Sequence, residues 1–362
     1  GGGGGGAGGM NAPTFAEQVR QLVAGARGDA VRQAPREFAA VCRAFADACV
    51  GMQTPLAAVR TLRKAIDKVQ PSATHLTPAH ADLLRVCLAG KCYHAAVRLV
   101  DADVLEVSKE ATGVRVLDVL CYFYYGGCVY AALKRFADAR RVLAQCVSVP
   151  AQLVSRVMLE AYKKYVLVSL LAGDGAASTS LPRHTSSAVG RHLKALTPQY
   201  QEFATAWATH SADDAHRVAD AYAEAFMADA NLGLVKQCVA ALYRHNIKRH
   251  TKTYITLPLQ RVADSVGISS ARAAEHNVLH MIERGEIFAT ISQRDGMLSF
   301  EDDPEQFDTC ATTERLEASL ADVVALARRI GQLDEDIQLS VPYIRRALKL
   351  GPAGGGAAGG AA

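Results

Sequence analysis

Apolar residues recur at intervals of three and four positions along most of the chain, from about residue 14 to residue 246. A clear example consists of Val59, Leu62, Ile66 and Val69, and it ends at Pro71. Residues with this spacing lie on one face of an α-helix, and a proline interrupts the helix that precedes it. We therefore predict a mainly α chain in which successive amphipathic helices pack against one another.

The stretch from 127 to 150 has nearly the spacing of a tetratricopeptide repeat (TPR), a pair of antiparallel helices. The residues that carry this spacing are Gly127, Tyr130, Ala139, Leu143, Cys146 and Pro150. A weaker copy lies upstream at Tyr93, Ala96 and Val100. We predict a TPR-like helical-repeat solenoid over residues 14–195, with an ordinary helical bundle as the alternative. Solenoids usually present binding surfaces for partners.

The pattern changes at Thr253, after a further helical part that we place at 196–252. A short helix is expected up to Val266, and Gly267 makes the turn after it. A second helix then runs from about 271 to 283, with Ser269 or Ser270 as its N-cap. Two β-type runs, 286–292 and 297–300, are then joined through Asp295 and Gly296. This order predicts a winged helix at 253–303.

The second run of this hairpin is a candidate contact surface. We expect it to be an edge strand whose free backbone donors pair with the strand of a neighbouring protein. The residues assigned to this winged-helix edge are Met297, Leu298 and Phe300.

A single amphipathic C-terminal helix is predicted at 304–350. Leu316, Leu320, Val323, Ala327 and Ile330 follow the alternating four-three spacing of a coiled coil, and Leu333 and Ile337 continue it out of phase. The apolar face needs a partner, which is either the preceding domain or helices of other chains.

Composition narrows the class of protein. Of the 362 residues, 50% are hydrophobic, which excludes a wholly disordered chain, and the net charge of +4 is weak evidence for a nucleic-acid partner. The longest uncharged run after the glycine-rich start, 119–133, is shorter than the roughly 20 residues that span a membrane. The glycine-rich ends, 1–13 and 351–362, and the loop 173–184 are expected to be flexible. The start shows no secretory signal.

Nine cysteines without any CxxC motif suggest reduced core thiols, with zinc ligands or disulfides as the alternative. We accordingly expect a nuclear and cytoplasmic protein.

The chain offers little catalytic chemistry. Neither a GxSxG elbow nor a Walker motif occurs, and the GxGxxG match of the terminal glycines has no strand before it. His276 and His280 have the spacing of two zinc ligands on a helix, but Asn277 stands where a metalloprotease of this type has its glutamate. A JAMM isopeptidase needs an HxH pair, which is absent. We therefore expect no catalytic, cofactor-binding or metal-binding residues, and no enzyme.

A basic run lies just before the winged helix and could contact phosphates. It comprises Arg244, His245, Lys248, Arg249, His250 and Lys252. The helix that would read DNA carries charges of both signs, so no specific nucleic-acid binding is expected. A nucleic-acid-binding winged-helix protein remains the alternative from another functional class.

The order of solenoid, winged helix and amphipathic C-terminal helix resembles the PCI family, found in the proteasome lid, the COP9 signalosome and translation initiation factor three. Several strings are similar to those of COP9 signalosome subunits: LEAYKKYVLVSL at 159–170, GLVKQC at 233–238, VLHMIE at 278–283, and GEIFA and DGMLSF within 285–300. The resemblance covers about 56–350. A proteasome-lid subunit of the same family remains the second hypothesis.

The resemblance implies a non-catalytic scaffold subunit of the complex that removes NEDD8 from cullins, with the JAMM metalloprotease in another subunit. Residues 253–302 would then contact other signalosome subunits, and 314–348 would enter a shared helical bundle. The implied bundle residues are Leu316, Leu320, Val323, Ile330, Leu333 and Ile337. Cullin-RING ligases would be indirect partners, and no membrane partner is implied.

Overall fold

The computed structural model describes residues 12–102, 104, 106–151, 153–173, 180–267, 270–302, 307 and 309–349. The chain divides after Glu301 into two units, which we describe separately. The predicted glycine-rich tails fall outside the described residues, except that the first helix begins at Ala12. Most of the predicted flexible loop 173–184 and the alternative N-cap Ser269 also fall outside them.

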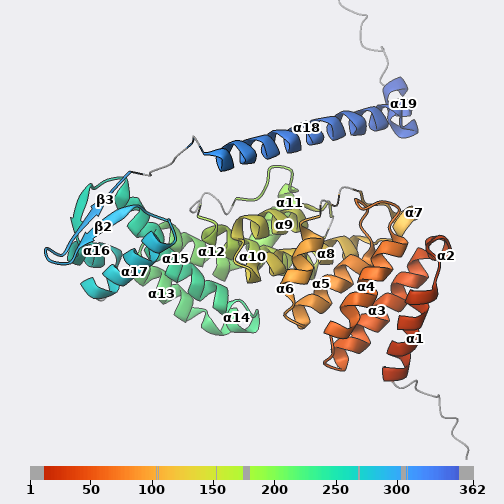
Figure 1. The fold of residues 1–362 in the computed structure, drawn as a ribbon, viewed down its shortest axis with the longest axis horizontal. Helices are drawn as coiled ribbons and strands as arrows, with labels where there is room; N and C mark the ends of the chain where they lie inside the picture. The colour runs from red at the N-terminus through yellow and green to blue at the C-terminus, as the bar shows by residue number, and fades with distance from the viewer. Residues whose placement is uncertain are drawn as a thin grey trace, which may run out of the picture. The chain divides into compact units, whose positions relative to one another are not determined.

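The first unit begins with helices that pack side by side (Figure 1), and the short α7 lies against α3. They confirm the prediction of a mainly helical chain. In chain order they are α1 (Ala12–Gly25), α2 (Gly28–Gln33), α3 (Pro35–Gly51), α4 (Leu56–Val69), α5 (Pro78–Ala89), α6 (Tyr93–Val100), α7 (Lys109–Thr112), α8 (Val116–Ala132), α9 (Phe136–Ser148) and α10 (Arg156–Leu171).

The predicted repeat unit corresponds to α8 and α9, which pack closely against each other. A Cβ atom added to Gly127 would lie 2.5 Å from Cγ of Leu143, so the two helices approach at a point where only glycine fits. Tyr130, Ala139, Leu143 and Cys146 are fully buried around this contact. The small residues in the repeat spacing therefore serve the close helix approach for which they were predicted.

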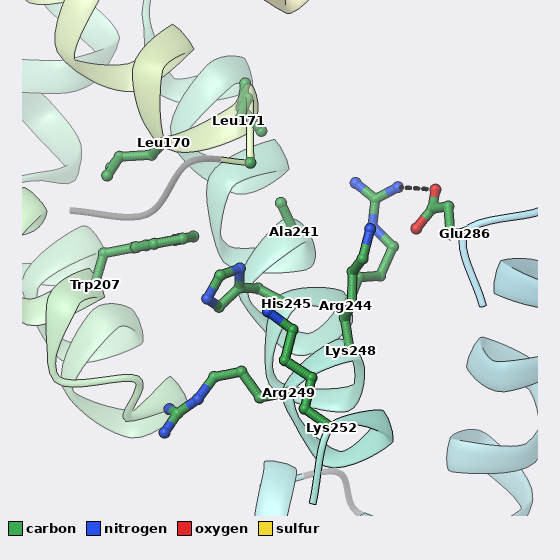
Figure 2. Close-up of a pocket in the computed structure, with 11 residues that line it drawn as sticks. Leu170, Leu171, Trp207, Ala241, Arg244, His245, Lys248, Arg249, Lys252 and Glu286 are labelled. Carbon is green, nitrogen blue, oxygen red and sulfur yellow. Dashed lines mark hydrogen bonds and ion pairs between the residues drawn. The ribbon is translucent and has the colours of Figure 1, made fainter. Parts of the chain in front are cut away.

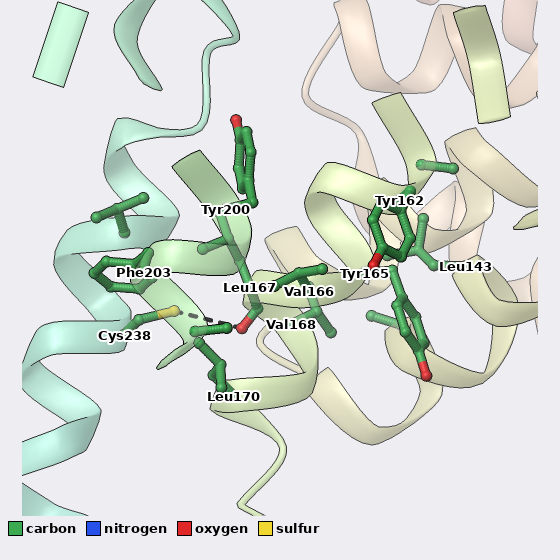
Figure 3. Close-up of a cluster of buried hydrophobic side chains, with 14 of the residues drawn as sticks. Leu143, Tyr162, Tyr165, Val166, Leu167, Val168, Leu170, Tyr200, Phe203 and Cys238 are labelled. Atoms are coloured by element: carbon green, nitrogen blue, oxygen red, sulfur yellow. Dashed lines mark hydrogen bonds between the residues drawn. The ribbon is translucent and has the colours of Figure 1, made fainter. Parts of the chain in front are cut away.

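Helix α10 is buried on several sides at once (Figure 3). Val166, Leu167 and Val168 are consecutive and fully buried, which a helix with one apolar face cannot achieve. Five further helices follow: α11 (Ser187–Leu196), α12 (Pro198–Ala208), α13 (Ala212–Ala221), α14 (Ala223–Ala228) and α15 (Leu232–Thr251). The backbone oxygen of Leu167 accepts a hydrogen bond from the Cys238 thiol of α15 at 3.4 Å.

A buried polar network joins α10 to the chain that follows it. The Lys163 ammonium donates to Glu160 at 2.8 Å and to Asp229 at 2.7 Å, and the Tyr200 hydroxyl donates to the second oxygen of Asp229 at 2.8 Å. Asn231 donates to the oxygen of Tyr200 at 2.9 Å. Burial opposes the charge of Lys163, yet the bonds to Asp229 and Glu160 raise its pKa above the ordinary value.

The unit ends in a winged helix made of β1 (Thr256–Pro258), α16 (Leu259–Val266), α17 (Ala271–Glu283), β2 (Ala289–Ser292) and β3 (Met297–Phe300). The turn after α16 is made by Gly267, whose φ of 76° lies in the left-handed region. Ser270 caps α17 by accepting a hydrogen bond from the Ala273 amide at 3.2 Å. The strands form an antiparallel sheet in the order β1-β3-β2.

The second unit contains two helices where we predicted one, namely α18 (Cys310–Leu339) and α19 (Val341–Lys349). The break falls at Ser340, which has an extended backbone with ψ of 138°. Pro342 explains it, because a proline has no N–H to donate to the carbonyl four residues earlier and its ring clashes with that turn. Among the described helices of both units, none is long and apolar enough to cross a membrane.

None of the nine cysteines forms a disulfide, and most are buried or half-buried, as predicted for reduced core thiols. Burial raises the pKa of the Cys42 thiol to about 12, so that thiol stays protonated and unreactive. Cys310 departs from the prediction because it is exposed at the start of α18.

Substituting Gly127 tests the close approach of α8 and α9. Because Leu143 is buried and cannot move away freely, we expect Gly127→Ala to lower the free energy of unfolding by about 1–3 kcal/mol. Gly233→Ala in α15 is the matched control, since nothing lies within 4 Å of its added Cβ, and we expect it to stabilise by about 0.5–1 kcal/mol. Urea unfolding measures both, and equal effects would contradict the contact.

His80 predicts a pH dependence of stability. It is buried at the start of α5, where its Nδ1 accepts from the Thr77 amide at 3.1 Å, and burial lowers its pKa to about 4. The unfolded chain takes up a proton near pH 6.5 and the folded chain does not, so stability falls as the pH drops from 6.5 towards 4.

The loss from His80 is about 2 kcal/mol between pH 7 and pH 5. We expect His80→Gln to flatten the profile of unfolding free energy against pH by that amount. Equal slopes for the two proteins, measured by urea unfolding at each pH, would rule out the contribution of His80.

Candidate interaction surfaces

The strand that we predicted to be a free edge is the central strand of the sheet. β3 pairs with β2 on one side and with β1 on the other, so its backbone donors are occupied. The prediction failed because β1 has only three residues and ends in Pro258, which gives too little alternation to be recognised. In the structure Ser299 pairs with Thr256 across this contact.

The side chains of β3 accordingly belong mainly to the core of the winged helix. Leu298 is fully buried and Phe300 nearly so, and both pack with Val262 of α16 and Val278 of α17. Met297 is half-buried. These three residues hold the sheet on the helices, and the backbone edge available to a neighbour lies elsewhere.

Among the described residues, β2 and β1 are the edges of this sheet. The outer side of β2 has no described strand beside it, and its Thr290 and Ser292 side chains are exposed. β1 is the poorer edge for strand addition because Pro258 lacks an N–H. The alternating polarity of residues 289–292 identified a strand in the sequence. The sequence did not show that this strand lies at the edge of the sheet.

The predicted bundle residues of the C-terminal unit all project from the surface of α18, in which no described residue is buried. Their exposed fractions range from 44% for Leu333 to 63% for Val323. The full set comprises Leu316, Leu320, Val323, Ile330, Leu333 and Ile337. Burying one such side chain gains about 1.5–3 kcal/mol, so this stripe is a strong candidate for a protein contact.

Sequence reasoning missed the continuation of this stripe. Val341, Ile344 and Leu348 of α19 are also exposed, at 58%, 42% and 77%. They follow Ile337 at intervals of four, three and four residues, which is the same spacing as in the first part of the stripe. The signal was therefore readable, and it runs through the break at Ser340.

The histidine pair and the basic run that we examined for catalysis and ligand binding lie on different helices. His276 and His280 are exposed on α17, and Nδ1 of His280 lies 3.3 Å from Glu283. No cluster of three or more metal-ligating side chains occurs in the described parts of the chain. The basic run occupies the C-terminal half of α15, where Arg244 pairs with Glu286 at 3.2 Å.

Comparison with known proteins identifies both parts of the first unit. Residues 8–189 match the family described as COP9 signalosome complex subunit 3, N-terminal helical repeats. Residues 218–302 match the PCI domain.

Two relatives match most of the chain. COP9 signalosome complex subunit 3 of Dictyostelium discoideum is 33% identical over 340 residues, which cover 93% of this chain and 81% of that protein. The protein of the same description from Drosophila melanogaster is 33% identical over 345 residues, 91% of this chain and 77% of that protein.

The revised role of β3 leads to a stability prediction. We expect Leu298→Ala to lower the free energy of unfolding by about 2–5 kcal/mol, because it removes a fully buried side chain from the winged-helix core. Thr290→Ala on the exposed edge is the control and should change stability by less than about 0.5 kcal/mol. If urea unfolding shows Leu298→Ala to be as mild as the control, Leu298 is a surface residue after all.

Proposed function

The chain belongs to the family of COP9 signalosome complex subunit 3, and on this premise we propose that it is a non-catalytic scaffold subunit of that complex. The observation that carries the proposal is the exposed apolar stripe of α18. Such a helix is stable only when its apolar face is covered. A subunit of an assembly obtains that cover from other subunits.

The stripe of α18 and α19 enters a helical bundle formed with other subunits. Its four-three spacing fits knobs-into-holes packing between helices, which needs apolar side chains at these intervals. Leu316, Leu320 and Val323 form the first part of the contact, and Ile330, Leu333 and Ile337 form the second. The residues of α19 extend it.

The winged helix supplies a second contact with a neighbouring subunit. The outer edge of β2 pairs with a strand of the neighbour, and backbone hydrogen bonds provide the affinity. Leu298, Phe300 and Met297 support this edge from within the sheet and do not themselves meet the neighbour. This assignment replaces the β3 edge expected from the sequence.

The chain supports the removal of NEDD8 from cullins without breaking the bond itself. This part rests on the family resemblance, in which a JAMM metalloprotease in another subunit performs the reaction. Cullin-RING ligases are then indirect partners, and the protein works in the nucleus and the cytoplasm. The names of both relatives favour the signalosome over the proteasome lid.

Substitutions in the stripe test the scaffold role. We expect Leu320→Asp combined with Ile330→Asp to abolish incorporation into the complex, because each buries a charge in an apolar contact. The isolated chain should keep its helical circular dichroism, since both side chains are exposed. Ala318→Asp combined with Ala325→Asp is the matched control on the opposite face of α18 and should leave assembly intact.

The measurement is affinity purification of each tagged variant from its native cells, followed by mass spectrometry and an assay of NEDD8 release from a neddylated cullin. Incorporation of the double stripe variant at the wild-type level would exclude the bundle contact. Recovery of proteasome ATPases with the wild-type chain would place it in the lid instead.

A further inference from the structure

A cavity of about 310 Å³ lies beside α15, where the end of α10 and the indole of Trp207 from α12 approach it (Figure 2). One wall is apolar and includes Leu170, Leu171 and Trp207. The other wall is the C-terminal half of α15. It contributes Ala241, Arg244, His245, Lys248 and Arg249, and Lys252 follows directly after the helix.

The charges that line this cavity are not balanced. Glu286 is the acidic residue in the lining, and Arg244 takes it as a partner at 3.2 Å. Within the part of the chain that the structure describes, no carboxylate forms an ion pair with Lys248, Arg249 or Lys252. By contrast, Lys163 has two acidic partners in the same unit.

The helix dipole explains the presence of only some of these cations. Basic residues in the last turn of a helix interact favourably with its dipole, which accounts for Lys248 and Arg249 being tolerated there. Arg244 and His245 lie more than a turn earlier, beyond the reach of that effect. Nor does the dipole explain why the cations meet an apolar wall in one cavity.

The pKa values of two histidines beside the cavity, His210 and His245, are lowered by burial and by the nearby cations. The rings of His210 and His245 are stacked with centroids 5.3 Å apart, and His245 lies 5.2 Å from the ring of Trp207. Burial lowers the pKa of His245, and His210 and the three cations lower it further. The environment therefore disfavours additional positive charge and favours an anion.

We propose that this cavity binds a small, multiply phosphorylated anion through Lys248, Arg249 and Lys252. Lys248 and Lys252 are one helical turn apart, about 6 Å along the axis, so their flexible stems can close on neighbouring phosphoryl groups. The planar guanidinium of Arg249 can bind two phosphate oxygens at once. The cavity volume is near the lower end of the range for ligand pockets, about 300–1,000 Å³, which favours a compact ligand.

A nucleic-acid strand fits these observations less well. Binding of single strands depends on aromatic faces on which bases stack, and Trp207 is only 1% exposed. The helix α17 presents Glu275 and Glu283 together with its basic residues, so it does not extend the positive surface.

The test uses the single tryptophan of the chain, which lines this cavity. The purified full chain is titrated with inorganic tripolyphosphate in a buffer free of divalent ions, and tryptophan emission and calorimetry are recorded. We expect saturable binding of one equivalent. Lys248→Glu should raise the Kd at least about tenfold, because the substitution reverses the charge of one ligand contact.

Lys236→Glu is the matched control, since Lys236 is also an exposed lysine of α15 but lies outside this cavity. This variant should change the Kd by less than about twofold. If both variants weaken binding equally, the net charge of the protein explains the effect and the proposed site is wrong. Far-UV circular dichroism confirms that each variant is folded.

Two further titrations identify the source of the phosphoryl groups. Equal affinity for ATP and tripolyphosphate would assign the site to the phosphate chain alone, and at least tenfold tighter binding of ATP would assign it to a nucleotide. Either result supports the proposal. The absence of saturable binding, or binding of a single-stranded DNA oligonucleotide without binding of tripolyphosphate, would overturn it.

Discussion

The buried ion pair between Lys163 and Asp229 is the interaction on which the arrangement of the first unit depends. Burying such a pair gains little net stability, but removing Lys163 would leave the carboxylates of Asp229 and Glu160 without their cation and would destabilise the fold. The pair and its link to Tyr200 connect α10 to α12 and to the residue that follows α14. Because α10 also packs against α8, α9 and α15, it connects the repeats to α15. The helix α15 then leads directly into the winged helix.

In the winged helix, one strand of the sheet contributes to the core and another offers its edge to a partner. Placing the most apolar strand, β3, at the centre puts Leu298 and Phe300 into the core and satisfies the backbone on both sides. The more polar β2 is left with an outer edge. An edge of this kind offers backbone hydrogen bonds to a partner without exposing a large apolar surface.

The C-terminal unit, in contrast, exposes its apolar side chains. α18 exposes a long apolar stripe and has no buried residue, so little in the unit itself stabilises the helix beyond local hydrogen bonds. In the proposed bundle, its apolar side chains would gain their stabilisation from the partner helices that cover them. The first unit, by contrast, has three hydrophobic cores of its own.

The sequence by itself determined the features that depend on neighbours along the chain. The periodicity of apolar residues identified the helices and the stripe through Leu320 and Ile330, and turn residues such as Gly267 identified the winged helix. Local patterns suffice there because helices and tight turns are built from contacts within a few residues. Only the tertiary structure decided the order of the strands, since β1 and β3 are 40 residues apart and β1 is too short to have a pattern of its own. The same holds for the charges of α15, because whether a cation is paired depends on which distant carboxylates the fold brings within reach.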